Sequence, residues 1–255
     1  MKIAVLNDIH GNRPALEAVL DEVDSLGCDR IVVGGDSAFG PMPREVLELL
    51  MSGGERVKFV LGNCDRDMIT SPHYKIALSE RVAARVRWAA GQLTPVQREL
   101  LASLPLTLEF DVEVLGRVLF CHGTPRSEDE IVTSITPESR LEPIYANVAA
   151  RVVVGGHTHI QYDRRVIGKR LINAGSVGMP FEDRPGAYWA LLGPDVRLMR
   201  TEYDYERAAR EIIATGFPEA ELYARGDPSL PSAPAELNAL FERMADERAK
   251  QESVG

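Results

Sequence analysis

This sequence of 255 residues has few of the residues that define several common classes of protein. Only three cysteines occur, Cys28, Cys64 and Cys121, and they lack the spacing of a zinc finger. So few cysteines, odd in number, exclude a disulfide framework and predict reduced thiols in a reducing compartment. The chain also has no apolar run near the roughly 18 residues that a membrane-spanning helix needs. We therefore expect no membrane span.

Clusters of basic residues are missing too. The net charge is −9 and the sequence pI is about 5.2, with no block of lysine and arginine. Proteins that bind long nucleic acids present such basic patches, so we expect neither long nucleic acid nor a membrane as a partner. A small phosphoester held by metal ions is compatible with an acidic protein. The N-terminal residues enter a strand pattern at once, without a signal-peptide layout, and this predicts a cytoplasmic location.

What is present is an ordinary globular composition, with 45% hydrophobic and 26% charged residues. A chain of this length suits one large α/β domain with an appendage. Apolar runs at 3–6, 31–33 and 57–61 predict three strands, and the helical patterns between them begin at Asn12 and Pro43. This β-α-β-α-β order predicts parallel strands with right-handed crossovers.

The rest of the chain predicts a helical insertion, a second β layer and a helical extension. We expect the insertion at about residues 66–105 and the extension over residues 201–255, packed on a domain of residues 1–200. Short apolar runs separated by turn residues predict further strands at 106–114, 117–121, 152–154, 162–167, 170–173, 187–192 and 195–200. Helices are expected near 137–149, 205–214 and 235–251, with a loop at 225–234. The pattern indicates an α/β fold of two packed sheets with outer helices. For the terminal helix we favour packing on the domain surface over a dimer contact.

Five short polar motifs each follow directly on an apolar, strand-like run. They contain four of the five histidines. The motifs are Asp8-Ile9-His10, Gly34-Gly35-Asp36, Gly62-Asn63-Cys64-Asp65, Cys121-His122-Gly123 and Gly155-Gly156-His157-Thr158-His159. Because ligands bind at the carboxyl ends of strands in open α/β sheets, five such ends can converge on one crevice. The sequence therefore predicts a site that gathers carboxylate, amide and imidazole groups.

Two of the motifs place ligand-type side chains two residues apart. On an extended strand Asp8 and His10 would share a face, and so would His157 and His159 after two glycines. Each motif alone also fits a simpler role, because Asp-x-His is often a turn with a helix cap and a lone buried histidine is often a hydrogen-bonded core residue. The joint pattern favours metal binding.

Carboxylate and imidazole ligands in one crevice suit a pair of divalent cations. A carboxylate between two sites can bridge ions about 3.5–4 Å apart. Mixed oxygen and nitrogen ligation favours Mn, Fe, Zn, Co or Ni over a site for Mg alone. Two cations would lower the pKa of a bridging water and generate hydroxide near neutral pH. The pattern thus predicts a hydrolase with two divalent metal ions, of which Mn is favoured.

The order of the motifs resembles the calcineurin-like metallophosphoesterases, over roughly residues 1–200. The Gly-Asn-Cys-Asp motif is most similar to small bacterial and archaeal phosphodiesterase-type members. The resemblance implies a four-layer αββα sandwich of two mixed sheets, with a dinuclear metal centre at the strand ends. It further implies that Asp8, His10 and His159 bind the first ion, that Asn63, His122 and His157 bind the second, and that Asp36 bridges them.

One position departs from the commonest pattern of that family. Cys64 stands where most members have a histidine, which is thought to protonate the leaving group or to steady the transition state. A thiol with an ordinary pKa near 8.5 is a weak substitute for imidazole, so esters with poor leaving groups should suffer most. We interpret Cys64 as a space-filling residue, with a catalytic thiol as the alternative. We expect the neighbouring Asp65 to support the ligands from behind, for example by orienting a ligand histidine.

We therefore predict a metal-dependent phosphoesterase that favours phosphodiesters, in which a hydroxide bridging the two ions attacks phosphorus in line. Catalytic roles are expected for Asp36, Asn63 and His122, and contacts with the substrate for Asn12, Arg13 and Asn63. A solvated surface role is equally compatible with Arg13. The alternatives are a phosphomonoesterase or protein phosphatase, a dinucleoside polyphosphate hydrolase and, in another class, a non-catalytic scaffold. Assembly into a homo-oligomer stays open.

Overall fold

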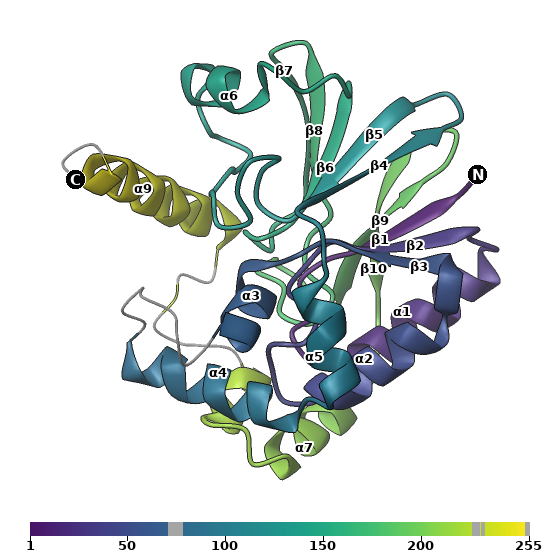
Figure 1. The fold of residues 1–255 in the computed structure, drawn as a ribbon, viewed down its shortest axis with the longest axis vertical. Helices are drawn as coiled ribbons and strands as arrows, with labels where there is room; N and C mark the ends of the chain where they lie inside the picture. Colours follow the sequence, from purple (N-terminus) through teal and green to yellow (C-terminus); the bar gives the residue numbers. More distant parts are fainter. Residues whose placement is uncertain (71–78, 226–229, 231–232, 253–255) are drawn as a thin grey trace.

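Two five-stranded mixed sheets stack face to face in the computed structural model, which describes residues 1–70, 79–225, 230 and 233–252 (Figure 1). The first sheet has the order β10-β9-β1-β2-β3 and the second β4-β5-β6-β8-β7. The strands of the first sheet are β1 (Ile3–Leu6), β2 (Arg30–Val33), β3 (Val57–Phe59), β9 (Ala187–Leu192) and β10 (Val196–Thr201). Those of the second are β4 (Thr107–Val112), β5 (Gly116–Cys121), β6 (Val152–Gly155), β7 (Tyr162–Val166) and β8 (Lys169–Asn173). As predicted, β1, β2 and β3 run parallel, whereas β9 and β10 are antiparallel.

Strand β1 shows how the two sheets share the core. Ile3 and Val5 face the second sheet and pack in one cluster with Phe120 of β5. Ala4 and Leu6 point the opposite way and pack in a second cluster with the helices on the outer face. Burial on both faces explains why this strand is a continuous apolar run. Helices outside each sheet complete four layers, so the predicted αββα sandwich is confirmed.

Helices α1 (Arg13–Ser25) and α2 (Pro43–Ser52) cover the outer face of the first sheet, and the 3-10 turn η1 (Gly54–Arg56) leads into β3 (Figure 1). Helix α1 begins as predicted, because the Asn12 side chain accepts a hydrogen bond from the backbone N of Ala15 at 3.2 Å. Helix α6 (Glu138–Tyr145) packs on the second sheet. It ends before the predicted residue 149, because Val148 N turns back to the carbonyl of Tyr145.

The helical insertion consists of α3 (Asn63–Thr70), α4 (Glu80–Gln92) and α5 (Pro95–Ala102). Helix α3 begins inside the third motif, at Asn63, and not at residue 66 as predicted. A capping box between Thr94 and Gln97 starts α5. Residues 71–78, which belong to the predicted insertion, lie outside the described residues.

The last part of the chain forms α7 (Tyr205–Ala214), α8 (Ala220–Arg225) and α9 (Pro234–Glu252). Helix α7 lies beside α1, and Arg207 pairs with Glu17 across them at 3.0 Å. The short helix α8 was not predicted, and most of the predicted loop that follows it lies outside the described residues. The division into a domain of residues 1–200 and an extension stays a prediction. Within the described part of the chain, no helix is long and apolar enough to cross a membrane.

Candidate metal centre

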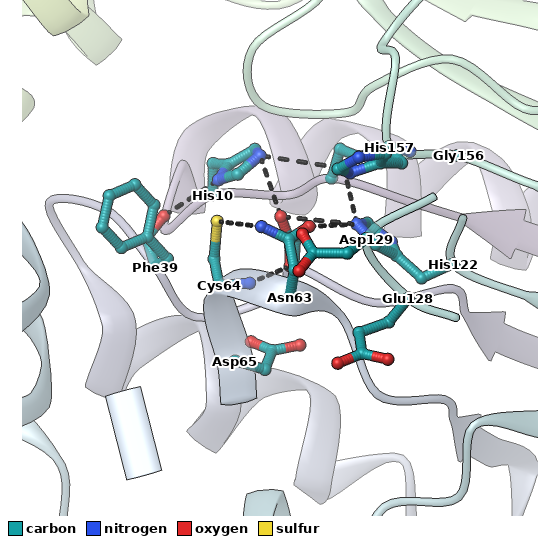
Figure 2. A network of polar contacts seen from close by, with 12 residues as sticks. His10, Phe39, Asn63, Cys64, Asp65, His122, Glu128, Asp129, Gly156 and His157 are labelled. Carbon is teal, nitrogen blue, oxygen red and sulfur yellow. Dashed lines mark hydrogen bonds and ion pairs between the residues drawn. The ribbon is translucent and has the colours of Figure 1, made fainter. Parts of the chain in front are cut away.

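The five motifs meet at one end of the two sheets, where each follows the carboxyl end of a strand. They come after β1, β2, β3, β5 and β6, so both sheets contribute. Figure 2 shows His10, Asn63, His122 and His157 gathered around the same small region. The fold therefore brings together groups that are far apart in the sequence.

Two carboxylates lie between the imidazoles of this cluster. Oδ1 of Asp8 is 3.2 Å from Nε2 of His159 and 3.7 Å from Nε2 of His122. Oδ2 of Asp36 is 3.4 Å from Nε2 of His122 and 3.8 Å from Nε2 of His10. Ligand-type atoms within 4.8 Å of one another form three groups among the described residues: Asp8 with His10 and His159, Asp8 with Asp36 and His122, and His10 with Asp36 and Cys64. Both carboxylates are thus shared, as a bridge between two ions requires.

The two remaining predicted ligands, Asn63 and His157, adjoin His122. Oδ1 of Asn63 lies 3.2 Å from Nε2 of His122. The rings of His122 and His157 meet edge to face, with centroids 5.2 Å apart. The backbone N of His157 also donates to Oδ2 of Asp8 at 2.9 Å. The structure therefore places all seven predicted ligands in one cluster, and their role as ligands stays a proposal.

Strained backbone, and not strand alternation, directs these side chains. Five of the seven predicted ligands have a positive φ, a region that residues other than glycine rarely adopt. They are Asp8 (52°), His10 (49°), Asp36 (51°), His157 (67°) and His159 (59°). The expectation that residues two positions apart converge because they share the face of an extended strand is wrong. The chain leaves each strand in a tight turn, and after β1 this turn places Oδ1 of Asp8 3.8 Å from Nε2 of His10.

Backbone carbonyls fix the direction of three imidazoles. A carbonyl oxygen only accepts hydrogen bonds, so the facing Nδ1 carries the proton and Nε2 points at the carboxylates. His10 donates to the carbonyl of Phe39 at 3.2 Å, His122 to that of Gly34 at 2.8 Å, and His159 to that of Met179 at 2.6 Å. Histidines that bind metal ions in proteins are typically held in this way.

Burial and neighbouring charges raise the pKa of some imidazoles in the cluster and lower the pKa of others. Burial opposes the protonation of His122, but the carboxylates, that of Asp36 first, outweigh it and raise the pKa to about 10. Burial and repulsion by a neighbouring imidazole lower the pKa of His10 to about 4 and that of His157 to about 4. At neutral pH His10 and His157 therefore offer lone pairs directly, whereas a cation must displace a proton from His122.

One buried oxygen tests whether these residues fit a metal ion. Asp8 is fully buried, and its Oδ1 accepts no hydrogen bond of good geometry among the described residues, although Nε2 of His159 lies 3.2 Å from it. Burial alone would raise the pKa of Asp8, but the imidazoles of His159 and His122 outweigh it and lower the pKa, so the carboxylate is charged. A buried charge is costly unless it is paired. Carboxylate, imidazole and amide donors suit a divalent transition metal, and the residues present fit such an ion.

Cys64 carries a neutral thiol at the edge of the cluster. Burial, with the charge of Asp36, raises the pKa of the thiol well above its ordinary value. The Asn63 amide donates to its Sγ at 3.4 Å, and its backbone N donates to Oδ1 of Asp36 at 2.8 Å. The backbone of Cys64 thus fixes the carboxylate of Asp36, and the neutral side chain of Cys64 favours the space-filling interpretation over a catalytic thiol.

Asp65 lies behind the predicted ligands and contacts backbone groups, not a histidine. Its carboxylate accepts hydrogen bonds from the backbone N of Ser37 at 3.3 Å and of Ala38 at 3.2 Å. Figure 2 shows it beyond Cys64, away from the imidazoles. Because α3 begins at Asn63, the helix turns this side chain toward the loop after Asp36. Asp65 therefore supports the loop that carries the Asp36 carboxylate.

The two predicted substrate contacts outside the cluster are engaged elsewhere. The Asn12 amide caps α1 and donates to the carbonyl of Gly178 at 3.0 Å. The Arg13 guanidinium lies 2.9 Å from Glu211 and 3.3 Å from Glu17. These contacts give Asn12 a structural role, which disfavours the predicted contact with substrate. For Arg13 that contact stays a prediction.

Two aromatic residues near the cluster could not be predicted from the sequence. The hydroxyl of Tyr223, in the unpredicted helix α8, donates to the backbone carbonyl of His10. The ring of Phe181 stacks on that of His159, with centroids 4.8 Å apart and 16° between the planes. Neither aromatic residue belongs to a motif.

The loop after His122 places two further carboxylates beside the cluster (Figure 2). Glu128 and Asp129 both pair with Arg66 of α3, Asp129 at 3.1 Å. Asp67 pairs with the same guanidinium at 3.0 Å. Three carboxylates thus share the guanidinium of Arg66. The edge of the cluster beside His122, formed by these residues, is called the acidic rim below.

These features define a class of protein, an αββα sandwich with a candidate divalent metal centre at its strand ends. Residues 1–193 match the family model of the calcineurin-like phosphoesterase superfamily domain, and the chain belongs to that superfamily. The superfamily is metal-dependent, in agreement with the groups of ligand-type residues in the cluster. Membership supports a hydrolase of phosphoric esters.

The similarity extends over most of the chain. A curated but uncharacterized protein of Methanocaldococcus jannaschii is 28% identical over 236 residues, 85% of this chain and 94% of that protein. The crystal structure of a hypothetical protein of Pyrococcus horikoshii OT3 has 25% identity and a TM-score of 0.74, over 86% of this chain and 96% of that one. That of a metallophosphoesterase of Sphaerobacter thermophilus has 27% identity and a TM-score of 0.69, over 88% and 98%.

Proposed function

We propose that this protein is a phosphodiesterase that acts on small phosphoesters with two divalent metal ions, Mn being favoured. Asp8, His10 and His159 would hold one ion, Asn63, His122 and His157 the other, and Asp36 would bridge them. The observation that carries the proposal is the position of the Asp36 carboxylate, 3.8 Å from His10 of one group and 3.4 Å from His122 of the other.

The residues of the chain prepare this site for phosphoryl chemistry. When bound, the two cations supply an activated water and neutralise charge on the phosphoryl oxygens. Asp36 is held for bridging by the backbone N of Cys64, and His122 is aimed by the carbonyl of Gly34. The Asn63 amide is an uncharged donor beside the cluster and can meet a phosphoryl oxygen. Such preset donors need no reorganisation when charge develops.

One feature selects for good leaving groups, and another favours a diester over a monoester. The thiol of Cys64 is neutral and a weak proton donor, so the leaving group takes its proton from water, and an ester with a good leaving group suffers least. Glu128 and Asp129 make one rim acidic, and a dianionic monoester is repelled more strongly there than a monoanionic diester.

The test is a substrate panel with the metal-loaded protein. With Mn²⁺ the protein should hydrolyse bis-p-nitrophenyl phosphate with a higher kcat/KM than p-nitrophenyl phosphate. Cyclic nucleotides, dinucleoside polyphosphates and a phosphopeptide in the same panel separate the other enzymatic classes. Asp36→Asn keeps the shape of the side chain and should reduce the activity at least a hundredfold, about the upper cost of a lost metal contact. Equal activity of Asp36→Asn would contradict the mechanism.

A non-catalytic scaffold is the rival from another class. It would bind no metal, so equilibrium dialysis against Mn²⁺ separates it from an enzyme, with the Asp36→Asn variant as the control. The cytoplasmic location and the absence of a long nucleic-acid partner stay predictions, as does the assembly state.

A further inference from the structure

The described part of the C-terminal segment, residues 205–225 and 234–252, contacts His10 directly through Tyr223 and indirectly through Phe217. The hydroxyl of Tyr223 donates to the backbone carbonyl of His10. On the other side, Nδ1 of His10 donates to the carbonyl of Phe39, whose ring meets Phe217 at 6.4 Å and 83°. Phe217 in turn meets the ring of Tyr223 at 5.4 Å. Because His10 has a φ of 49°, its conformation persists only when its surroundings hold it.

The same segment approaches His159 through a row of rings. Phe181 stacks on His159 with centroids 4.8 Å apart, and its ring lies 6.2 Å from Phe241 of α9. Nδ1 of His159 is occupied by the carbonyl of Met179. The ring of His159 is therefore held at its edge by a hydrogen bond and on its face by Phe181, which α9 supports.

Helix α9 is itself fixed on the domain. Its Glu242 accepts hydrogen bonds from the hydroxyls of Thr133 and Thr136, both at 2.6 Å, and pairs with Arg140 at 2.8 Å. Leu237 of the same helix is 2% exposed, so an apolar contact accompanies the polar ones. These contacts fix the place from which Phe241 reaches Phe181.

The other half of the cluster is supported by a different part of the chain. His122 is aimed by the carbonyl of Gly34 and lies 3.2 Å from the Asn63 amide. Its ring meets that of His157, whose backbone N donates to Asp8. All of these partners precede residue 201. Helix α9 reaches this side only through Arg248, which donates to the backbone carbonyl of Asp129 at 3.0 Å and contacts none of the predicted ligands.

We propose that the C-terminal segment is a brace for one metal-binding group only, the one formed by Asp8, His10 and His159. Tyr223 is a positioning residue that acts through the backbone of His10. Phe241 is a positioning residue that acts on His159 through the ring stack. The inference rests on the proposed function, because it takes these three residues as the ligands of one ion.

The test measures metal binding by the full chain, freed of metal with a chelator and titrated with Mn²⁺ by calorimetry and equilibrium dialysis. The variants are Tyr223→Phe, which removes one oxygen, Phe241→Ala, and the two combined. Tyr205→Phe at the exposed start of α7 and Met244→Ala on the exposed side of α9 are the matched controls. Thermal unfolding in the presence of chelator checks that each variant is folded.

The unmodified chain and both controls should bind two equivalents of Mn²⁺. The combined variant should keep one equivalent at full affinity and bind the other ten- to a hundredfold more weakly, the usual effect of losing support behind a ligand. General loosening of the fold would weaken both equivalents alike, and this result overturns the brace, as does full binding by the combined variant. If the unmodified chain binds no Mn²⁺, the proposed function fails, and the brace fails with it.

Discussion

The carboxylate of Asp36 lies 3.4 Å from Nε2 of His122. The contact joins a loop of the first sheet to a strand end of the second, and with the other carboxylate it holds a proton on the imidazole. Burial alone would favour the neutral ring, yet the pKa of His122 is raised to about 10. A proton therefore occupies the position that the second metal ion would take.

From this contact we predict that metal binding releases a proton and tightens with pH. Between pH 7 and 9 the apparent affinity for Mn²⁺ at the His122 site should rise about tenfold per pH unit, because one proton competes with the ion. Calorimetry in two buffers of different ionisation enthalpy measures the released proton. His157→Ala should bind the same ion more weakly but release as many protons per ion bound, because the pKa of His157 is about 4 and its ring is already neutral at these pH values. If His122→Ala releases the same number of protons per Mn²⁺ bound, the released proton does not come from His122.

The same pKa predicts how stability depends on pH without metal. The pKa of His122 is higher in the folded than in the unfolded chain, so its stabilising contribution is complete below about pH 6.5, the unfolded value. It is lost as the pH rises toward about 10. In chelator, the midpoint of thermal unfolding should fall from pH 7 to pH 10 more in the unmodified chain than in His122→Ala. An equal fall in both would remove His122 as the cause.

Gly62 gives a prediction about packing around the bridge. A Cβ built on Gly62 would lie 2.1 Å from Oδ1 of Asp36 and 2.2 Å from its backbone N. Gly62→Ala should therefore cost about 2 kcal/mol or more in the free energy of unfolding and remove most of the activity. Gly91→Ala in α4 meets nothing within 4 Å and should stabilise the protein by about 0.5–1 kcal/mol. Urea unfolding with an activity assay checks both.

A substitution at Cys64 tests whether this residue only fills space or acts as a catalytic thiol. Because burial raises the pKa of its thiol well above the ordinary value, Cys64→Ser should retain activity on bis-p-nitrophenyl phosphate within a few-fold, with the same pH profile. If the serine variant instead loses the activity while its metal binding is intact, the thiol takes part in the reaction.

The sequence predicted those residues of the site that directly follow a buried strand. Asp8 and Asp36 each follow a buried strand of the first sheet, and the parallel order of these strands brings their ends to one edge. His122 follows a buried strand of the second sheet and reaches them because the two sheets stack. The geometry within the site needed φ values that no pattern of side chains reveals, such as the 49° of His10.

The residues that sequence reasoning missed act over long sequence separations. Tyr223 is 213 positions from His10, and its helix α8 has six residues and no capping signal. The motif indicates that Asp65 supports the ligands but does not reveal its partner, because the helix that starts at Asn63 turns it to the backbone of Ser37. Local patterns describe neither tertiary contact.

Asp129 leads to the last prediction, which concerns substrate charge. It lies on the acidic rim, pairs with Arg66, and repels a monoester more than a diester by the effect of one additional charge. At a separation near 7 Å in water that difference is roughly 0.6 kcal/mol, or about threefold. Asp129→Asn should therefore raise kcat/KM for p-nitrophenyl phosphate about threefold relative to bis-p-nitrophenyl phosphate. The effect should shrink in 1 M salt, where the screening length falls to about 3 Å.

Asp111→Asn on the exposed side of β4 is the matched control and should leave the ratio of the two kcat/KM values unchanged. A ratio that stays constant in Asp129→Asn at low salt would mean that the charge of Asp129 has no part in the choice of diesters over monoesters.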